Sequence, residues 1–158
     1  MYRIYGDSHG KDQKFLTKEI LKYSPNLIGY ELLYHSKILG YKNIIAMEFD
    51  KNPSSTHPRN PNTEWLFQLS KIIKCDGLIG IDLPHVEGDS LADKFKIREN
   101  FMVKRIHYIF NKTTKAIIIV GDTHLRTTST KELGSPSPIV SEFKDIATII
   151  RSRYGEIK

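Results

Sequence analysis

The sequence lacks the features of a membrane, secreted or fibrous protein. None of its apolar runs approaches the ~20 residues that a membrane-spanning helix needs. The N-terminus becomes polar after five residues, so we expect no signal peptide. The single cysteine, Cys75, excludes an internal disulfide and is typical of a reducing compartment. We therefore expect a cytoplasmic protein in which Cys75, flanked by apolar residues, serves packing.

The chain also lacks any cluster of basic residues, although its net charge is +6 and its pI is about 9.3. No stretch gathers five or more lysines and arginines, and scattered lysines are typical of solvated helix faces. There is no Walker loop, dinucleotide fingerprint or zinc finger. We therefore expect a small-molecule or peptide substrate rather than nucleic acid, and no pattern specifies an oligomeric state.

Four short, isoleucine-rich apolar runs have the length of β-strands. Their nearly continuous apolar character predicts strands that are buried on both faces, as in a parallel sheet. They occupy residues 2–5, 43–49, 77–83 and 116–120.

Helical patterns lie between these runs and after the last one. They cover residues 11–23, 26–39, 63–73, 90–111 and 138–150. Alternating strands and helices predict an α/β fold with three layers. We expect a mainly parallel sheet of four strands, or slightly more, with helices on both faces and one domain over residues 1–158. The two long loops, residues 50–61 and 127–138, are expected to rim a pocket.

Polar residues of the same kinds follow each predicted strand. The first and last strands both end in Gly-Asp-(Ser/Thr)-His, at residues 6–9 and 121–124, while Glu48 closes the second. The carboxyl ends of parallel strands meet at one edge of the sheet, where ligands bind in open α/β folds. The sequence therefore predicts an active site built on His9, Glu48 and His124.

Three kinds of chemistry fit this set of side chains. His9, Glu48 and His124 together can hold a divalent metal such as zinc, manganese or cobalt and leave positions open for water. A histidine oriented by a carboxylate can instead activate water directly. Thirdly, a histidine can ligate haem iron.

Further polar residues are candidates for orienting a substrate. Arg98, in the helix before the last strand, is predicted to bind a substrate carboxylate or a developing oxyanion, although an exposed helix arginine explains it equally well. By contrast, Glu31 falls on the predicted helix of residues 26–39, where we expect it to be solvated or ion-paired, and His85 is expected to be a loop residue. The remaining candidates for substrate binding are Asp7, Asp82, Asp122 and Arg126.

Four of these segments resemble motifs of the superfamily that groups erythromycin esterases, ChaN-like haem-binding proteins and Tiki/TraB proteins. They are Gly6–Gly10, the strand that ends in Glu48, the Arg98-Glu99-Asn100-Phe101-Met102 helix start and the Gly121–Arg126 segment. The resemblance implies an active-site set of His9, Glu48, Arg98 and His124. It implies a hydrolase of peptidase or esterase type, or a haem or small-ligand binding protein. The chain departs from the pattern at Asp7, where the esterases often have glutamate, and in its short length.

Two other enzyme classes share parts of this pattern. Metallophosphoesterases also begin with Asp-x-His-Gly, as at residues 7–10, but their later ligand motifs are missing here. Serine hydrolases with a Gly-Asp-Ser block would use Ser8 as the nucleophile, with Asp82 and His85 as its partners. That pair normally lies near the end of the chain, whereas 73 residues follow it here.

Overall fold

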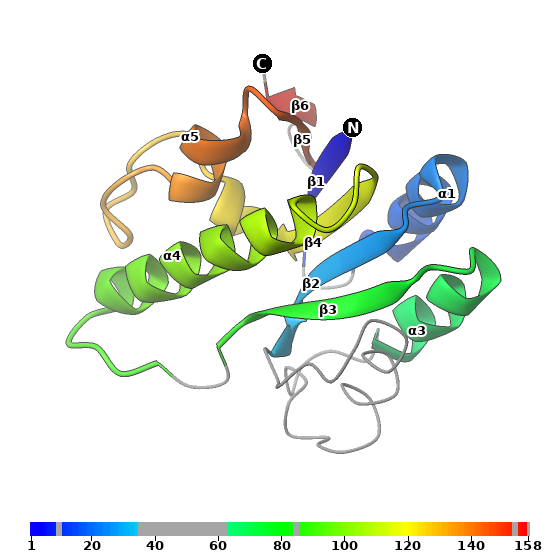
Figure 1. The fold of residues 1–158 in the computed structure, drawn as a ribbon. Helices are drawn as coiled ribbons and strands as arrows, with labels where there is room; N and C mark the ends of the chain where they lie inside the picture. Colours follow the sequence, from blue (N-terminus) through cyan, green and yellow to red (C-terminus); the bar gives the residue numbers. More distant parts are fainter. Residues whose placement is uncertain (9–10, 35–62, 84–85, 153–154, 158) are drawn as a thin grey trace.

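Three of the four apolar runs form strands of one sheet in the computed structural model (Figure 1). The structure describes residues 1–8, 11–34, 63–83, 86–152 and 155–157. Strand β1 covers Tyr2–Asp7, β3 covers Gly77–Asp82 and β4 covers Ala116–Gly121. The side chains of β3 are all buried, as the continuous apolar run predicts. The fourth run, residues 43–49, lies outside the described residues.

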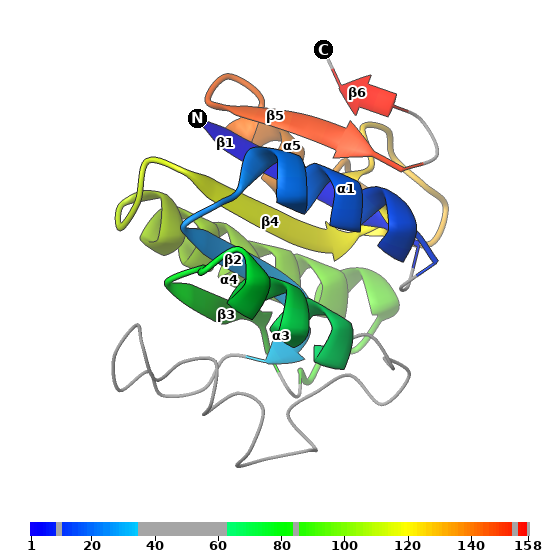
Figure 2. The ribbon, with the colours of Figure 1, turned by 90° about the vertical axis from the view of Figure 1, so that its right-hand side faces the viewer.

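The sheet has six strands in the order β3-β2-β4-β1-β5-β6. The first five strands pair in parallel, and β6 pairs with β5 in antiparallel fashion (Figure 2). Asp7 at the end of β1 lies in register with Gly121 at the end of β4, and Tyr34 of β2 pairs with Asp82 of β3. The polar residues that close these strands therefore reach the same edge of the sheet. The predicted mainly parallel α/β sheet is confirmed, with more strands than four.

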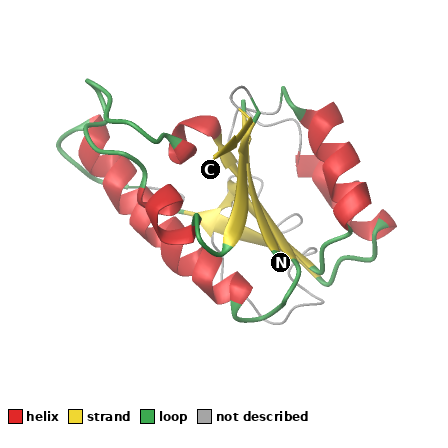
Figure 3. Ribbon diagram, turned by 90° about the horizontal axis from the view of Figure 1, so that it is seen from above, coloured by secondary structure: helices red, strands yellow, loops and turns green. Residues whose placement is uncertain are grey.

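Helices cover both faces of the sheet (Figure 3). Helix α1, Gln13–Tyr23, and helix α3, Thr63–Ile72, pack on one face, where Leu16, Ile20 and Leu66 are buried against Ile117 and Ile119. Helix α4, Leu91–Phe110, and helix α5, Pro138–Phe143, cover the other face. No helix in the described part of the chain is both long and apolar enough to cross a membrane.

The segment that follows α1 is a strand, so the prediction of a helix over residues 26–39 was wrong. Ser24 takes the left-handed conformation with φ 49° and closes α1, and Pro25 follows. Strand β2 then covers Leu27–Tyr34. Leu27 packs into the core beneath α4, and Ile28 packs into the core beneath α1. Leu27 and Ile28 thus lie on opposite faces of the sheet, as expected for a strand that is buried on both sides. The prediction interpreted this apolar pattern as one side of a helix.

The C-terminal segment was also predicted wrongly in part. The helix expected over residues 138–150 ends as α5 at Phe143. The chain then forms β5, Ala147–Arg151, which pairs with β1, and β6, Gly155–Ile157, which closes the sheet. The β-branched residues Thr148, Ile149 and Ile150 favour a strand over a helix. They extend the sheet past β1.

Candidate active site

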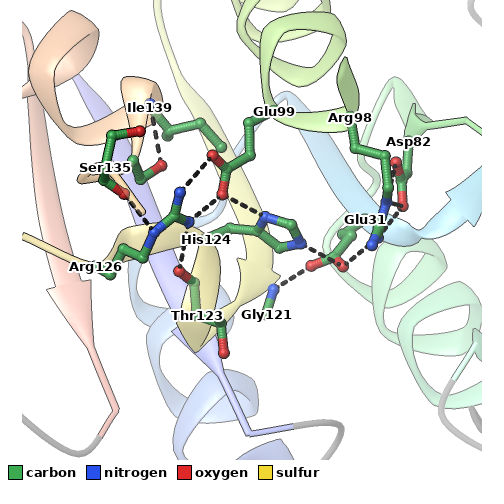
Figure 4. A network of polar contacts seen from close by, with 11 residues as sticks. Glu31, Asp82, Arg98, Glu99, Gly121, Thr123, His124, Arg126, Ser135 and Ile139 are labelled. Carbon is green, nitrogen blue, oxygen red and sulfur yellow. Dashed lines mark hydrogen bonds and ion pairs between the residues drawn. The ribbon is translucent and has the colours of Figure 1, made fainter. Parts of the chain in front are cut away.

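The sheet has a topological switch point between β2 and β4. After β2 the chain continues through α3, on the face that α1 covers, to β3 at one end of the sheet. After β4 it continues through α5, on the face that α4 covers, to β5 towards the other end of the sheet. Adjacent strands whose connections leave in opposite directions open a crevice at their carboxyl ends, where ligands bind in open α/β sheets. A buried network of charged residues lies here (Figure 4).

His124 stands at the centre of this network. It belongs to the short 3₁₀ turn η2, Asp122–Leu125, which follows β4 directly, and it is only 3% exposed. Its Nδ1 lies 3.0 Å from Oε1 of Glu99, and its Nε2 lies 3.1 Å from Oε1 of Glu31. The ring of Phe95 stacks on the imidazole at 4.8 Å between centroids. Each ring nitrogen thus faces a carboxylate, and α4 covers one face of the ring.

Glu31 reaches this site from β2 and is also buried. Its Oε1 accepts from Nη2 of Arg98 at 3.1 Å as well as facing His124, and its Oε2 accepts the backbone N–H of Gly121. A Cβ atom at position 121 would lie 3.0 Å from Oε2 of Glu31. Glycine at the end of β4 therefore lets the carboxylate approach the backbone closely.

The ionisation of this pair follows from its neighbours. Burial by itself raises the pKa of Glu31, but the His124 cation, the Gly121 N–H and Arg98 outweigh it and lower the pKa to about 2. Burial likewise lowers the pKa of His124, but the carboxylates of Glu31 and Glu99 outweigh it and raise the pKa to about 9. At neutral pH His124 is thus an imidazolium that donates from both ring nitrogens.

Arg98 and Asp82 continue the network at the end of β3. Nε of Arg98 lies 3.1 Å from each Asp82 oxygen, and Nη2 lies 2.5 Å from Oδ2. Burial raises the pKa of Asp82, and the hydrogen bonds from Arg98 offset part of that effect. The predicted site residues Arg98 and Asp82 therefore bind each other, and Arg98 links them to Glu31.

Glu99 and Arg126 continue it on the other side. Nη1 of Arg126 donates to Oε1 of Glu99 at 2.5 Å, and Nη2 donates to Oε2 at 3.1 Å. Burial raises the pKa of Glu99, but its hydrogen bonds with His124 and Arg126 outweigh that effect and lower it. Positive and negative groups therefore alternate along the whole network, in the order Arg126, Glu99, His124, Glu31, Arg98 and Asp82.

The other predicted residues lie in several places. Asp7 is buried at the end of β1, beside Gly121 in the register. Asp122 pairs with Arg151, whose Nη2 lies 2.6 Å from its Oδ2. His9, Glu48 and His85 lie outside the described residues.

The described residues do not test the predicted metal and haem sites. In the part of the chain that the structure describes, no three histidine, cysteine or carboxylate side chains are placed to hold a metal together. His124 could take a metal on Nε2 only by releasing Glu31. The predicted ligand set of His9, Glu48 and His124 therefore stays a prediction.

A hollow of about 350 Å³ opens beside the Glu99–Arg126 end of the network. Its walls include Lys96 and Asn100 from α4 and Ser135 from the loop of residues 127–137. That loop was predicted to rim a pocket, and it contributes to this one. The loop of residues 50–61 lies outside the described residues.

Two central residues, Glu31 and Glu99, were not among the predicted site residues. Glu31 was set aside because it was placed on a helix. The turn residues Ser24, Pro25 and Asn26 before an apolar run with β-branched and aromatic members are the signal that predicts a strand there, and hence a polar residue at the sheet edge. Glu99 carries no comparable signal, since a glutamate within a charged helix is ordinary.

Comparison with known proteins shows the fold of the chain. No family model matches it, and no curated protein matches it in sequence. Three similar solved structures are titled as bacterial toxins or as a toxin effector domain. One is titled a crystal structure of RRSP, a MARTX toxin effector domain from Vibrio vulnificus CMCP6, with a TM-score of 0.58 and 18% identity over 98% of this chain and 34% of that one. Two others, titled as bacterial protein toxins, have TM-scores of 0.61 and 0.60, with 14% and 13% identity over 99% of this chain and 35% of theirs.

These findings correct the family assignment made from the four short motifs. The chain spans about a third of the length of the toxin structures it matches, and at this identity the likeness shows the fold alone. The assignment to the superfamily of erythromycin esterases, ChaN-like proteins and Tiki/TraB proteins was wrong: the similar structures are toxin domains, and no family model matches. Each of the four motifs spans only a few residues, which is too short to identify a family.

Proposed function

We propose that this chain is a hydrolase of the peptidase or esterase type, in which Glu31 and His124 handle the protons of an attacking water. The supporting observation is a buried histidine held between two carboxylates at the switch point of the sheet. Taking such charges out of water is costly, and apolar residues of similar size are often at least as stabilising. Strongly perturbed pKa values at a ligand-binding edge are typical of functional sites.

In the proposed reaction Glu31 takes a proton from water as the water oxygen bonds to the substrate carbonyl carbon. The Nε2–H of the His124 imidazolium, which faces Glu31 in the structure, turns to the negative oxygen that develops and donates a hydrogen bond to it. The carbon–nitrogen or carbon–oxygen bond then breaks, and the proton on Glu31 passes to the leaving group. The carboxylate is regenerated, so protons and electrons balance.

Substrate binding raises the basicity of Glu31 in this proposal. A carboxylate with a pKa of about 2 is a weak base at neutral pH. The His124 cation contributes most to lowering that pKa, and the Gly121 N–H and Arg98, which also binds Asp82 through two nitrogens, contribute less. A substrate oxygen that takes the Nε2–H of His124 from Glu31, and draws Arg98 towards Asp82, raises the pKa of Glu31 and activates it.

The test uses two general probes, fluorescein-labelled casein and p-nitrophenyl acetate. Casein comes first because the chain shares its fold with domains titled as toxins and as a toxin effector. We expect turnover by the natural sequence and a loss on the order of 10²-fold in Glu31→Gln and in His124→Asn. Glu142→Gln is the matched control, since it removes an exposed carboxylate from another histidine, His107.

Each assay is run with EDTA and with added zinc, manganese or cobalt, which separates direct activation of water from a metal-assisted form. Full activity in folded Glu31→Gln would contradict the proposal. So would the absence of turnover of both probes by the natural sequence under all of these conditions. A large stability loss in both variants with no activity to lose would indicate that the network serves the fold.

A further inference from the structure

Glu99 holds His124 through the ring nitrogen that faces away from Glu31. Nδ1 of His124 lies 3.0 Å from Oε1 of Glu99, which is fully buried. The proposed reaction uses the opposite nitrogen, Nε2. A carboxylate on Nδ1 helps to fix how the ring is turned and favours a proton on Nδ1, and Nε2 then carries a second proton only when the ring is the imidazolium.

Glu99 is itself held in a fixed orientation by Arg126. The guanidinium binds both carboxylate oxygens in a fork, which fixes the plane of the carboxylate as well as its position. The other bonds of Arg126 go to the carbonyl oxygens of Ser135 at 2.9 Å and Thr123 at 3.2 Å. Arg126 is thus engaged by Glu99 and by the backbone on two sides, which holds its guanidinium, and with it the Glu99 carboxylate, in place.

We propose that Glu99, clamped by Arg126, is a positioning residue that turns the His124 ring so that Nε2 points at Glu31. The proposal rests on the proposed function for its catalytic meaning, since it concerns the same histidine. Glu99 touches neither water nor substrate in this scheme. It acts through His124.

Glu99 keeps the ring of His124 in one of its two orientations. Phe95 stacks on the ring, but a half turn about the Cβ–Cγ bond returns the ring to the same plane with Nδ1 and Nε2 replaced by Cδ2 and Cε1. Glu31 and Glu99 each face one ring nitrogen. Because Glu31 takes part in the proposed reaction, the clamped carboxylate of Glu99 is the contact that holds the ring while Glu31 changes its bonds.

Helix α4 also ties this contact to the rest of the site. Arg98 and Glu99 are consecutive on α4, and they bind Glu31 and His124 respectively. The packing of one helix on the sheet therefore sets both halves of the reacting pair. The site therefore includes Glu99 of α4 and the segment that carries Arg126.

The experiment compares the natural sequence with Glu99→Gln by ¹⁵N NMR of the histidine rings, with the His124 signals identified from His124→Asn. In the natural sequence we expect both ring nitrogens of His124 to be protonated at pH 7. In Glu99→Gln, where Glu31 still faces Nε2, we expect the pKa of His124 to fall and the ring to exchange between two orientations, so that the single set of ring signals broadens or splits. Glu142→Gln should change the signals of His107 and leave those of His124 unchanged.

Kinetics on the probe that is turned over supply the second readout. We expect Glu99→Gln to lower kcat on the order of 10²-fold with KM nearly unchanged, and to shift the pH profile. Arg126→Lys, which keeps the charge but loses the fork, should reproduce both effects to a smaller degree. Arg126→Lys also tests the positioning role if Glu99→Gln does not fold.

The two readouts separate the inference from the proposed function. Unchanged His124 ring signals in folded Glu99→Gln or Arg126→Lys would overturn the positioning role, even if the enzyme is active. If no probe is turned over, the proposed function fails, and changed ring signals still establish that Glu99 sets the state of His124. A loss of stability with unchanged ring signals would assign Glu99 to the fold alone.

Discussion

Replacing Glu31 by glutamine tests whether the charge network is as tightly coupled as its geometry indicates. Glutamine keeps the size and shape of the side chain but removes the negative charge between two cations, His124 and Arg98. Removing one partner of a buried ion pair costs roughly 3–5 kcal/mol, because the remaining charge is left buried. The lowering of the Glu31 pKa from 4.5 to about 2 corresponds to about 3 kcal/mol at ~1.4 kcal/mol per unit. We therefore expect Glu31→Gln to lower the free energy of unfolding by about 3 kcal/mol at pH 6.

The pH dependence of this loss has a definite sign at each end. The folded pKa of Glu31 is lowered, so its contribution is present above pH 4.5 and disappears as the pH falls towards 2. The folded pKa of His124 is raised, so its contribution is present below pH 6.5 and disappears as the pH rises through about 9. Both shifts arise from one interaction, which is counted once. The difference between the natural sequence and Glu31→Gln should be largest between pH 4.5 and 6.5.

Urea denaturation followed by the fluorescence of Trp65 measures this difference. Trp65 is the single tryptophan, and its Nε1 donates to Oγ1 of Thr17 in the folded chain, so its emission reports unfolding of the α1–α3 face. Glu142→Gln, at an exposed pair, should change stability by less than ~0.5 kcal/mol. A loss below 1 kcal/mol at pH 6 in Glu31→Gln, or a loss that stays constant from pH 6 to pH 10, would refute the reasoning.

Three other predictions concern packing, capping and thiol reactivity. Gly29→Ala places a Cβ 2.7 Å from Cδ1 of Ile118, so we expect overpacking to cost about 1–3 kcal/mol in urea denaturation; an unchanged midpoint would contradict the tight packing of β2 on β4. Ser90→Ala removes the side chain that accepts the backbone N–H of Asp93 in the first turn of α4 and should cost ~1 kcal/mol, whereas a stability equal to that of the natural sequence would show that solvent replaces the cap. Burial raises the pKa of Cys75 to about 11, so its reaction with iodoacetamide at pH 8 should be slow in the folded chain and fast in urea. Equal rates in the two conditions would contradict the burial of its thiol.

The sequence by itself determined the class of the fold and much of the sheet edge. Runs such as Ala116–Val120 are apolar at every position, and at strand length this pattern favours a strand buried on both faces. His124 was predicted as a site residue because it follows a strand, and Arg98 because its segment lies in the helix before the last predicted strand. Both residues lie in the network. These features depend on short-range patterns.

Other features depended on the tertiary structure. A short apolar run fits a buried strand or a helix, and β2 became a strand because β3 and β4 pair with it on both sides. That pairing carried Glu31 to the switch point, 93 residues along the chain from His124. The contact between Glu99 and His124 likewise exists because α4 packs across the sheet above β4. The charge of His124 also depends on the tertiary structure, because its pKa is set by the carboxylates of Glu31 and Glu99, which no local pattern places beside it.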